Sequence, residues 1–463
     1  MKRDLLKELR EGAQLSRRDQ IRLIVQLSLP AIMAQLSHIV MQYIDAAMVG
    51  RLGSAQSASI GLMSSSTWLL SGLLTASVTG FTVQVAQRIG SGEEKTARDV
   101  MKQGFAFALS FAALLALGAA AVSGWLVTWL GADASIAQDA RDYILVYALS
   151  LPFVQLNNLS AGMLQASGNM RIPSILQVIM CFLDVVFNAL LIFPGTTVFG
   201  VHIPGAGLGV LGAALGTAAA QAVTGVVMFL FLAVRSAMLR FRRGEGFCLE
   251  RRYFARAMRI ALPIGAERMI MSTAYVMATR IVAPLGTIAI AANSFGVTAE
   301  SLCYMPGYGI AAAATTLIGQ SIGAKRDELT PRLGALTVAL GMAIMTVSGA
   351  LMYAFAPLMI GVMSPDPQVI ELGARVLRIE AFAEPLFAAS IVAAGVFRGA
   401  GDTLMPSIFT FMTMWCIRLP VSALLAPRMG LVGVWIAMAL DLSTSGVLFL
   451  TRLRSKRWLH QKK

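Results

Sequence analysis

The chain has 463 residues, of which 57% are apolar and only 13% are charged, and its mean hydropathy is +0.70. Soluble globular proteins carry about 25% charged residues, so this composition excludes a water-soluble domain and predicts a membrane protein. The net charge of +14 comes from short basic loops without interleaved stacking aromatics, which is typical of membrane topology rather than of nucleic-acid binding.

Apolar stretches of about 20 residues recur along the whole chain, and each is long enough to cross a hydrocarbon core of about 30 Å. Backbone polar groups must be satisfied internally in lipid, so each stretch is expected to be a helix. The predicted spans lie at 23–49, 57–87, 103–130, 143–166, 172–194, 208–234, 255–283, 288–321, 333–360, 370–397, 404–426 and 431–451. The expected fold class is therefore all-α, a polytopic membrane protein with about 12 transmembrane helices.

Basic residues gather at the N-terminus, near 88–102, within 235–259 and in the tail from Arg452 to Lys463, all on one side of the predicted spans. The positive-inside bias then places both termini in the cytoplasm, which requires an even number of spans. The first 22 residues lack an apolar stretch with a cleavage site. We therefore expect no cleaved signal peptide and a multi-pass protein of the inner membrane.

Sliding the sequence against itself until Pro30 falls on Pro263 superimposes further prolines and glycines, in order along six spans. At this repeat offset the other pairs are Pro152 with Pro385, Pro173 with Pro406, Gly53 with Gly286, Gly90 with Gly323, Gly162 with Gly395 and Gly168 with Gly401. Shared turns and kinks indicate a duplication. Because six spans return the chain to its starting side, both copies run in the same direction, as in transporters whose parallel repeats flank the substrate path. The predicted domains are two six-helix lobes, 1–235 and 255–463, joined by an arginine-rich linker, 236–254.

Polar side chains inside the predicted spans of the first half are candidates for function, because a charge at mid-bilayer costs on the order of 3 kcal/mol or more. The first span carries several at helical spacing, and the fifth carries two one turn apart. The candidates for cation or proton coupling are Asp45, Asp184, Asn188 and His38. The candidates for a substrate cavity are Gln35, Gln42, Asn157 and Asn158. The alternative is that these groups only form hydrogen bonds between helices.

The second half has acids of its own. Glu300, Tyr304 and Tyr308 share one helical face, where an acid flanked by aromatic rings would suit an organic cation. Glu380 and Glu384 lie one turn apart before a proline. We count Glu300, Tyr304, Tyr308 and Glu384 as further candidates for the substrate cavity. The candidates for ion pairs are Arg280, Glu300, Arg418 and Asp441.

The chain shows no pattern of an enzyme. Its cysteines are isolated, which indicates buried thiols rather than metal ligands; they are Cys181, Cys248, Cys303 and Cys416. There is no phosphate-binding loop and no nucleophile elbow. We therefore expect neither a cofactor nor a bound metal, and an ion gradient of protons, or alternatively of sodium, is expected to drive transport.

Three stretches carry a family resemblance. They are Asp45 to Gly53 (DAAMVGRLG), Gly395 to Thr403 (GVFRGAGDT) before Pro406, and its duplicate Gly162 to Asn169 (GMLQASGN) before Pro173. Together with the span number and the repeat, they make the chain, from about 20 to 452, similar to the bacterial multidrug and toxic compound extrusion (MATE) family.

The resemblance implies a V-shaped pair of six-helix lobes that exchange a cation for amphipathic, often cationic, small molecules. In proton-linked members an aspartate on span one works with an Asn/Asp pair on span five, which Asp45, Asp184 and Asn188 match with the pair in swapped order. The sodium-linked branch has acids on spans seven and ten, where this chain has Met271 and Phe387. This departure favours proton coupling, and with it the DNA-damage-inducible-protein-like branch.

The hypothesis from the sequence is a monomeric, proton-linked exporter in which protonation of Asp45 bends or repacks the first span at Pro30. Proline removes a helix hydrogen bond and permits such a kink. One rival is a flippase for lipid-linked or cell-wall precursors, which Arg280 and Arg418 keep open. A second rival is a membrane scaffold that transports nothing.

Overall fold

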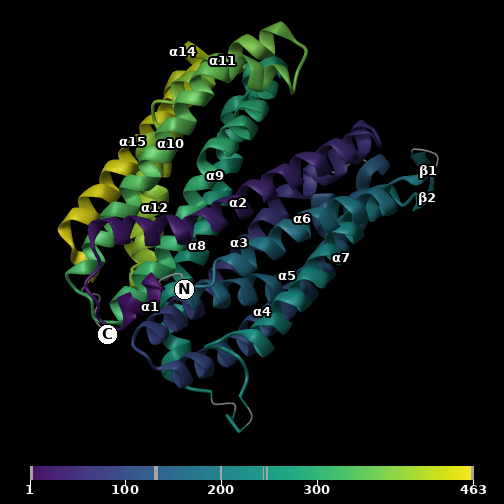
Figure 1. Ribbon diagram of the computed structural model, residues 1–463. Helices are drawn as coiled ribbons and strands as arrows, with labels where there is room; N and C mark the ends of the chain where they lie inside the picture. Colours follow the sequence, from purple (N-terminus) through teal and green to yellow (C-terminus); the bar gives the residue numbers. More distant parts are fainter. Residues whose placement is uncertain (1–3, 130–133, 199–200, 243, 247–248, 460–463) are drawn as a thin grey trace. The chain divides into compact units, whose positions relative to one another are not determined.

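The computed structural model describes residues 4–129, 134–198, 201–242, 244–246 and 249–459. Within these ranges, nine helices are long and apolar enough to cross a membrane, or ten if one bent pair counts as a single span. Figure 1 shows that the described chain is almost entirely helical. The prediction of a polytopic helical membrane protein is therefore confirmed.

Every predicted span has a helix, or two consecutive helices, in its place. The first six are α2 (Arg17–Gly50), α3 (Ser54–Gly90), α4 (Glu94–Trp129), α5 (Ala134–Ala166), α6 (Arg171–Ile192) and α7 (Gly209–Leu230), the last extended by a π-helical turn (Phe231–Arg235). The last six are α8 (Arg251–Val282), α9 (Thr287–Gly323), α10 (Leu329–Gly361), α11 (Pro367–Glu380) with α12 (Glu384–Ala400), α13 (Leu404–Thr413) with α14 (Leu419–Met429), and α15 (Leu431–Ser455). A short helix, α1 (Leu5–Arg10), precedes them.

Two of the predicted spans are interrupted in their interior. The span predicted at 370–397 divides into α11 and α12, which are bent by 59° at a break before Pro385. Proline has no N–H to donate and clashes with the preceding turn, so Pro385 accounts for the position of the break. The span predicted at 404–426 contains a π-helical turn, Met414–Arg418, between α13 and α14.

The all-α fold contains one short pair of strands, which the sequence did not indicate. An antiparallel hairpin, β1 (Pro194–Val198) and β2 (Val201–Ala206), joins α6 to α7 and pairs Pro194 with Ala206. In Figure 1 it lies at the ends of these two helices. The segment is too short to span a bilayer and carries Thr and Val, which favour extended backbone, so the hydropathy pattern did not distinguish it from a loop.

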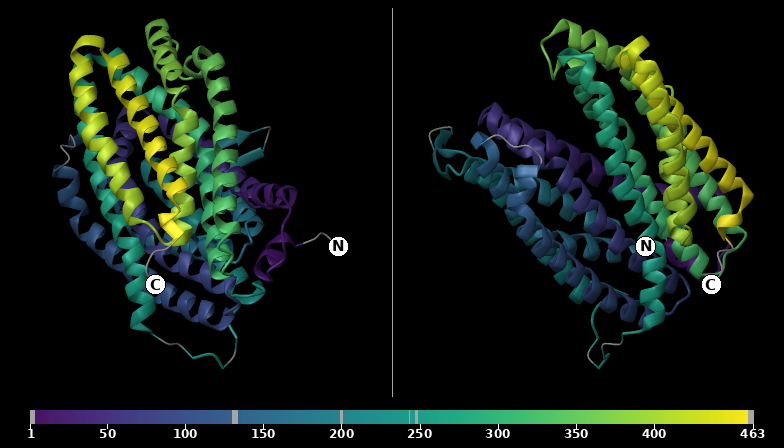
Figure 2. Two further views of the ribbon diagram at one scale, coloured as in Figure 1. Left: turned by 90° about the vertical axis from the view of Figure 1, so that its left-hand side faces the viewer. Right: turned by 180° about the vertical axis from the view of Figure 1, so that it is seen from behind.

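The helices form two compact units, and they do not divide at the middle of the chain. Unit 1 comprises Met1–Leu36, Ala86–Gly92 and Arg259–Lys463, and unit 2 comprises Ser37–Val85 and Glu93–Met258. Unit 1 thus contains the beginning of α2, with Pro30 inside it, and the end of α3. Within unit 1, α14 and α15 pack side by side, as both views of Figure 2 show.

Two glycines of the repeat make one close helix crossing in unit 1. A Cβ atom added at Gly90, at the end of α3, would overlap the carbonyl oxygen of Gln320 on α9. A Cβ atom added at Gly323 would overlap the carbonyl oxygen of Gln87. Gln87 and Gln320 are themselves paired at the repeat offset, so the duplicated positions face each other. Glycine is required here because it lets two helix backbones touch.

In unit 2, the linker after α7 is attached to the start of α4. The Arg98 guanidinium donates hydrogen bonds to the Glu245 carboxylate at 2.6–3.0 Å and to the Met238 carbonyl oxygen at 3.0 Å. The Arg98 side chain is 3% exposed. These hydrogen bonds hold the pKa of Glu245 below its ordinary value, because they stabilise the charged carboxylate. The linker between the halves is therefore attached to α4 through Met238 and Glu245.

Candidate functional site

Three polar side chains of α2 and α6 meet in unit 2. The Asn188 amide donates one hydrogen bond to Asp45 Oδ1 and another to Asp184 Oδ2, both at 3.0 Å. Asp184 and Asn188 are each 1% exposed, whereas Asp45 is half-buried. Among the described residues, no lysine or arginine forms an ion pair with either carboxylate. One neutral amide thus joins two acids and ties the first span to the fifth.

A glycine on the sixth span makes room for this amide. A Cβ atom added at Gly216 on α7 would overlap Asn188 Oδ1, and one added at Gly212 would overlap the carbonyl oxygen of Leu191 on α6. The two glycines form a Gly-x-x-x-Gly pattern, which lets membrane helices approach closely. The sequence carries this pattern at 212–216, but the pattern alone does not indicate that Asn188 is the neighbour.

The other candidates on the first span lie around the acids with different contacts. His38 is within electrostatic range of Asp184, and its Nδ1 is buried without a hydrogen-bond partner among the described residues. Its Nε2 lies 3.5 Å from Gln42 Nε2. Gln42 is exposed, and Gln35 is half-buried in the part of α2 that belongs to unit 1.

Two polar side chains of the fourth span, Gln155 and Asn157, connect helices. Asn157 is 4% exposed, and its amide donates to Gln221 Oε1 on α7 at 3.0 Å. In the same helix, Gln155 donates to Ser77 Oγ on α3 at 2.8 Å. Asn158 is half-buried. These are the interhelical hydrogen bonds of the alternative interpretation, although the Asn157 oxygen is left without a partner in the described part of the chain.

The candidates of the second half belong to unit 1, whereas Asp45 belongs to unit 2. Tyr304 packs edge-on against Tyr308 and Phe387, with ring centroids 5.9 and 5.6 Å apart. Glu300 and Glu384 are 5% and 0% exposed. The flippase alternative depended on Arg418 and Arg280. Arg418 lies 3.9 Å from Asp441, and Arg280 is exposed.

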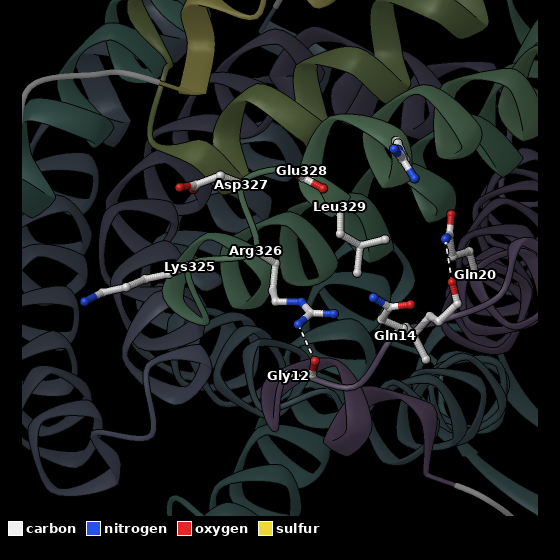
Figure 3. A pocket seen from close by; sticks show the side chains of 10 residues that line it. Gly12, Gln14, Gln20, Lys325, Arg326, Asp327, Glu328 and Leu329 are labelled. Atoms are coloured by element: carbon white, nitrogen blue, oxygen red, sulfur yellow. Dashed lines mark hydrogen bonds between the residues drawn. The ribbon is translucent and has the colours of Figure 1, made fainter.

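A surface cavity of about 420 Å³ lies elsewhere in unit 1, between the segment before α2 and the turn after α9. Figure 3 shows Arg326 at its centre, directed to the carbonyl oxygen of Gly12. The Arg326 guanidinium also donates to the Ala13 carbonyl oxygen. Asp327 and Glu328 line the cavity beside Lys325, so both charge signs are present. Arg326 therefore holds the N-terminal segment against this turn.

No group of three or more His, Cys, Asp or Glu side chains in the described ranges is arranged to hold a metal ion. Cys181 and Cys303 are buried and Cys416 is exposed, all with free thiols, and Cys248 lies outside the described residues. The site at Asp45 consists of two carboxyls and an amide, which can bind and release protons and form hydrogen bonds with a ligand.

The repeat and the motifs have a counterpart in one known family. The family model MatE matches the chain twice, over residues 30–190 and 263–424. The chain belongs to the MatE family. The two matches begin at Pro30 and Pro263, the same pair of prolines that indicated the duplication. The MatE proteins are multi-span membrane transporters, and membership confirms the resemblance seen in the sequence.

Curated relatives cover nearly the whole chain at low identity. A probable multidrug resistance protein NorM of Thermotoga maritima is 26% identical over 442 residues, which are 94% of this chain and 92% of that protein. The multidrug resistance protein MdtK of Yersinia pestis is 24% identical over 464 residues, 96% of each chain.

Solved structures show the same fold. A MOP superfamily transporter from Pyrococcus furiosus has a TM-score of 0.88 at 20% identity, covering 98% of both chains. A mutant of the MATE transporter VcmN from Vibrio cholerae has a TM-score of 0.87 at 19% identity, covering 96% of this chain and 99% of that one. Membership of the MatE family was therefore predictable from the sequence, and the fold class is that of MATE transporters.

Proposed function

We propose that this MatE protein is a secondary exporter that exchanges protons for amphipathic or cationic small molecules, with Asp45 as the proton carrier. The observation that carries the proposal is the pair of hydrogen bonds from Asn188 to Asp45 and Asp184. Relatives that match over almost the whole chain are named multidrug resistance proteins, which supports the class of cargo.

Two carboxyls within interaction range of each other cannot both be charged in a low-dielectric site without a large penalty. Protonation of one relieves the repulsion, and the Asn188 amide can then serve the remaining carboxylate. Asp184 is sealed, whereas Asp45 is half-buried and therefore nearer to water. We assign the exchange of protons to Asp45 and the support of its charge state to Asp184 and Asn188.

Protonation at Asp45 has a route to the conformation of the first span. Loss of its charge weakens the hydrogen bond from Asn188, because hydrogen bonds to charged groups are stronger than neutral ones. The span is then freer to move relative to α6. Pro30, inside the same helix, is the place where the helix bends most easily.

The proposed setting is the inner membrane, with both termini in the cytoplasm and the protein working as a monomer without a cofactor. The basic loops support this orientation through the positive-inside bias. A flippase for anionic lipid-linked precursors has less support, because Arg418 lies beside Asp441 and Arg280 is exposed.

The test is efflux of a cationic amphipathic dye from proteoliposomes under an imposed proton gradient or an imposed sodium gradient of equal size. We expect dye movement to follow the proton gradient and to be the same with or without sodium. Movement driven by sodium alone would contradict the proposed coupling ion, and no movement under either gradient would contradict export of this class of compound.

A further inference from the structure

Three glutamates in unit 1 form a second group of buried acids. Glu300 lies on α9, Glu380 ends α11, and Glu384 begins α12. They are 5%, 0% and 0% exposed. Glu380 is within electrostatic range of both Glu300 and Glu384, and Glu384 is within range of Glu300. The break between α11 and α12 therefore brings two acids to a third.

These carboxyls lack the contacts that a charged group needs. Within the described part of the chain, none of the four carboxyl oxygens of Glu380 and Glu384 has a hydrogen-bond partner. An ionised carboxylate buried in this way is strongly disfavoured. An apolar side chain would fill the same space with less penalty, and the acids therefore require an explanation beyond packing.

The first half of the chain shows how the same positions look when they only pack. At the repeat offset, Glu380 corresponds to Tyr147 and Glu300 to Thr67. In unit 2 the Tyr147 hydroxyl donates a hydrogen bond to the Thr67 carbonyl oxygen at 3.1 Å. The fold thus accommodates a satisfied neutral contact at this place, and the second half has two acids there instead.

A cation inside the protein lies close to this group. Arg418 ends the π-helical turn between α13 and α14, a feature that is frequent at functional sites. Its Nη1 is 3.9 Å from Asp441 Oδ2 on α15, which is longer than a direct hydrogen bond. Arg418 is also within electrostatic range of Glu300 and Glu380. The guanidinium also donates a hydrogen bond to Met438 Sδ on α15, at 2.7 Å. It lies among three acids without a direct hydrogen bond to any of them in the described chain.

The remaining ionisable groups that face the glutamates come from α9. Cys303 and Tyr304 are within electrostatic range of Glu300 and Glu384. The Cys303 thiol donates to the carbonyl oxygen of Ser348 on α10. A thiol and a phenol are neutral in their ordinary state near pH 7. Arg418 is therefore the positive charge that the described residues place within range of the glutamates.

We propose that Glu300, Glu380 and Glu384 form a second proton-binding site, and that Arg418 is the internal cation that replaces the proton. When a carboxyl O–H bond breaks, the proton leaves to water and the carboxylate attracts the guanidinium away from Asp441. When the proton returns, the guanidinium goes back. This site extends the proposed proton coupling to the second half of the chain, but its titration does not depend on export.

The test labels the carboxyls directly. Dicyclohexylcarbodiimide adds to a protonated carboxyl in an apolar site and rearranges to a stable N-acylurea, which mass spectrometry locates. The full chain in lipid nanodiscs is treated from about pH 5 to about pH 9, a range that brackets perturbed carboxyls. We expect Glu380 or Glu384 to be labelled at low pH and progressively less as the pH rises. Glu371, exposed on α11, is the matched control and is expected to stay unlabelled.

The arginine variants test the second part. In Arg418→Gln the loss of labelling is expected to move to higher pH by about one unit, because the carboxylate has lost its counter-charge. Arg418→Lys keeps a positive charge and is expected to move it less. Melting temperatures of both variants identify a folding defect. If Arg418→Gln is unfolded, the test is whether Arg418→Lys moves the pH at which labelling is lost.

Three results would overturn the proposal. Labelling that is constant across the pH range would mean glutamates that are permanently protonated, and no labelling at any pH would mean that they do not hold protons. Protection by sodium at constant pH would identify a metal cation as the ligand instead. Asp45→Asn is expected to leave the labelling profile unchanged, so failure of the exporter mechanism and failure of this site are distinguishable.

Discussion

The two halves of this duplicated chain treat their buried acids differently. In unit 2, Asp45 and Asp184 share the amide of Asn188 across a helix interface, and Asp45 remains half-buried. In unit 1, Glu380 and Glu384 are fully sealed, and their oxygens have no partner in the described chain. The Asp45 site therefore has a hydrogen-bond donor ready for a carboxylate, whereas the glutamate site can hold a carboxylate only if Arg418 moves toward it.

The difference shows what duplication preserved. At the repeat offset, Asp45 and Asp184 correspond to Ala278 and Ile417. The prolines and glycines that shape the backbone recur in both halves, but the two acids Asp45 and Asp184 do not. The frame is therefore symmetric, and the chemistry is placed separately in each half. We expect substitutions at the acids to affect one half's function, and substitutions at the shared glycines to affect folding.

The largest effect is expected from Asp45→Asn, which removes the proton carrier with almost no change in shape. Proton-driven dye efflux should fall on the order of tenfold or more. Typical coupling free energies correspond to changes of roughly 5- to 150-fold, so this loss lies within their range. Efflux rates in proteoliposomes measure it. Asp142→Asn, which removes a carboxylate that contacts Gln138 elsewhere in unit 2, is the control and should retain efflux. Equal rates for the two variants would break the distinction between the Asp45 site and other acids.

A smaller effect is expected from Gly216→Ala, because the new Cβ would overlap Asn188 Oδ1 and displace the amide from both carboxyls. Overpacking of this kind costs about 1–3 kcal/mol and should also reduce efflux. Gly118→Ala is the matched control, since a Cβ there meets no atom within 4 Å. Thermal unfolding and efflux of both variants sharpen the comparison. A Gly216 variant that behaves like the Gly118 variant would show that the glycine does not position the site.

The smallest effect is expected from Glu245→Gln in the linker. The variant loses the ion pair with Arg98 but keeps the contact of Arg98 with the Met238 carbonyl, so we expect about 1 kcal/mol of lost stability and unchanged efflux. Because the pKa of Glu245 is lowered in the folded protein, its contribution is present above the ordinary pKa and disappears as the pH falls through the lowered value. Melting temperatures of the wild type and of Glu245→Gln should therefore differ at neutral pH and become equal at acidic pH.

Helices, repeat and family were accessible from the sequence because they depend on periodic or ordered features. Apolar length predicts spans, and the prolines mark a duplication whose offset the two family matches reproduce. The meeting of Asp45 with Asn188 was expected from depth and family resemblance, but its geometry was not. The partner of Asn188 on α7 is a glycine, which has no side chain to signal a contact.

Other features depend on tertiary contacts that no local pattern contains. The hairpin between α6 and α7 is a short segment in which Pro194 pairs with Ala206. The attachment of the linker to α4 depends on Arg98 meeting Glu245, which is far away in the chain. The assignment of the beginning of α2 to unit 1 likewise follows from packing and not from composition.

The most direct test of proton exchange at Asp45 is the release of protons when a substrate binds. A cationic dye substrate is added to the detergent-purified protein in weak buffer, and a pH indicator records the protons set free. The account predicts proton release by the wild type and by Asp142→Asn, and none by Asp45→Asn. Equal release by Asp45→Asn would contradict it, because another group would then carry the proton that the substrate displaces.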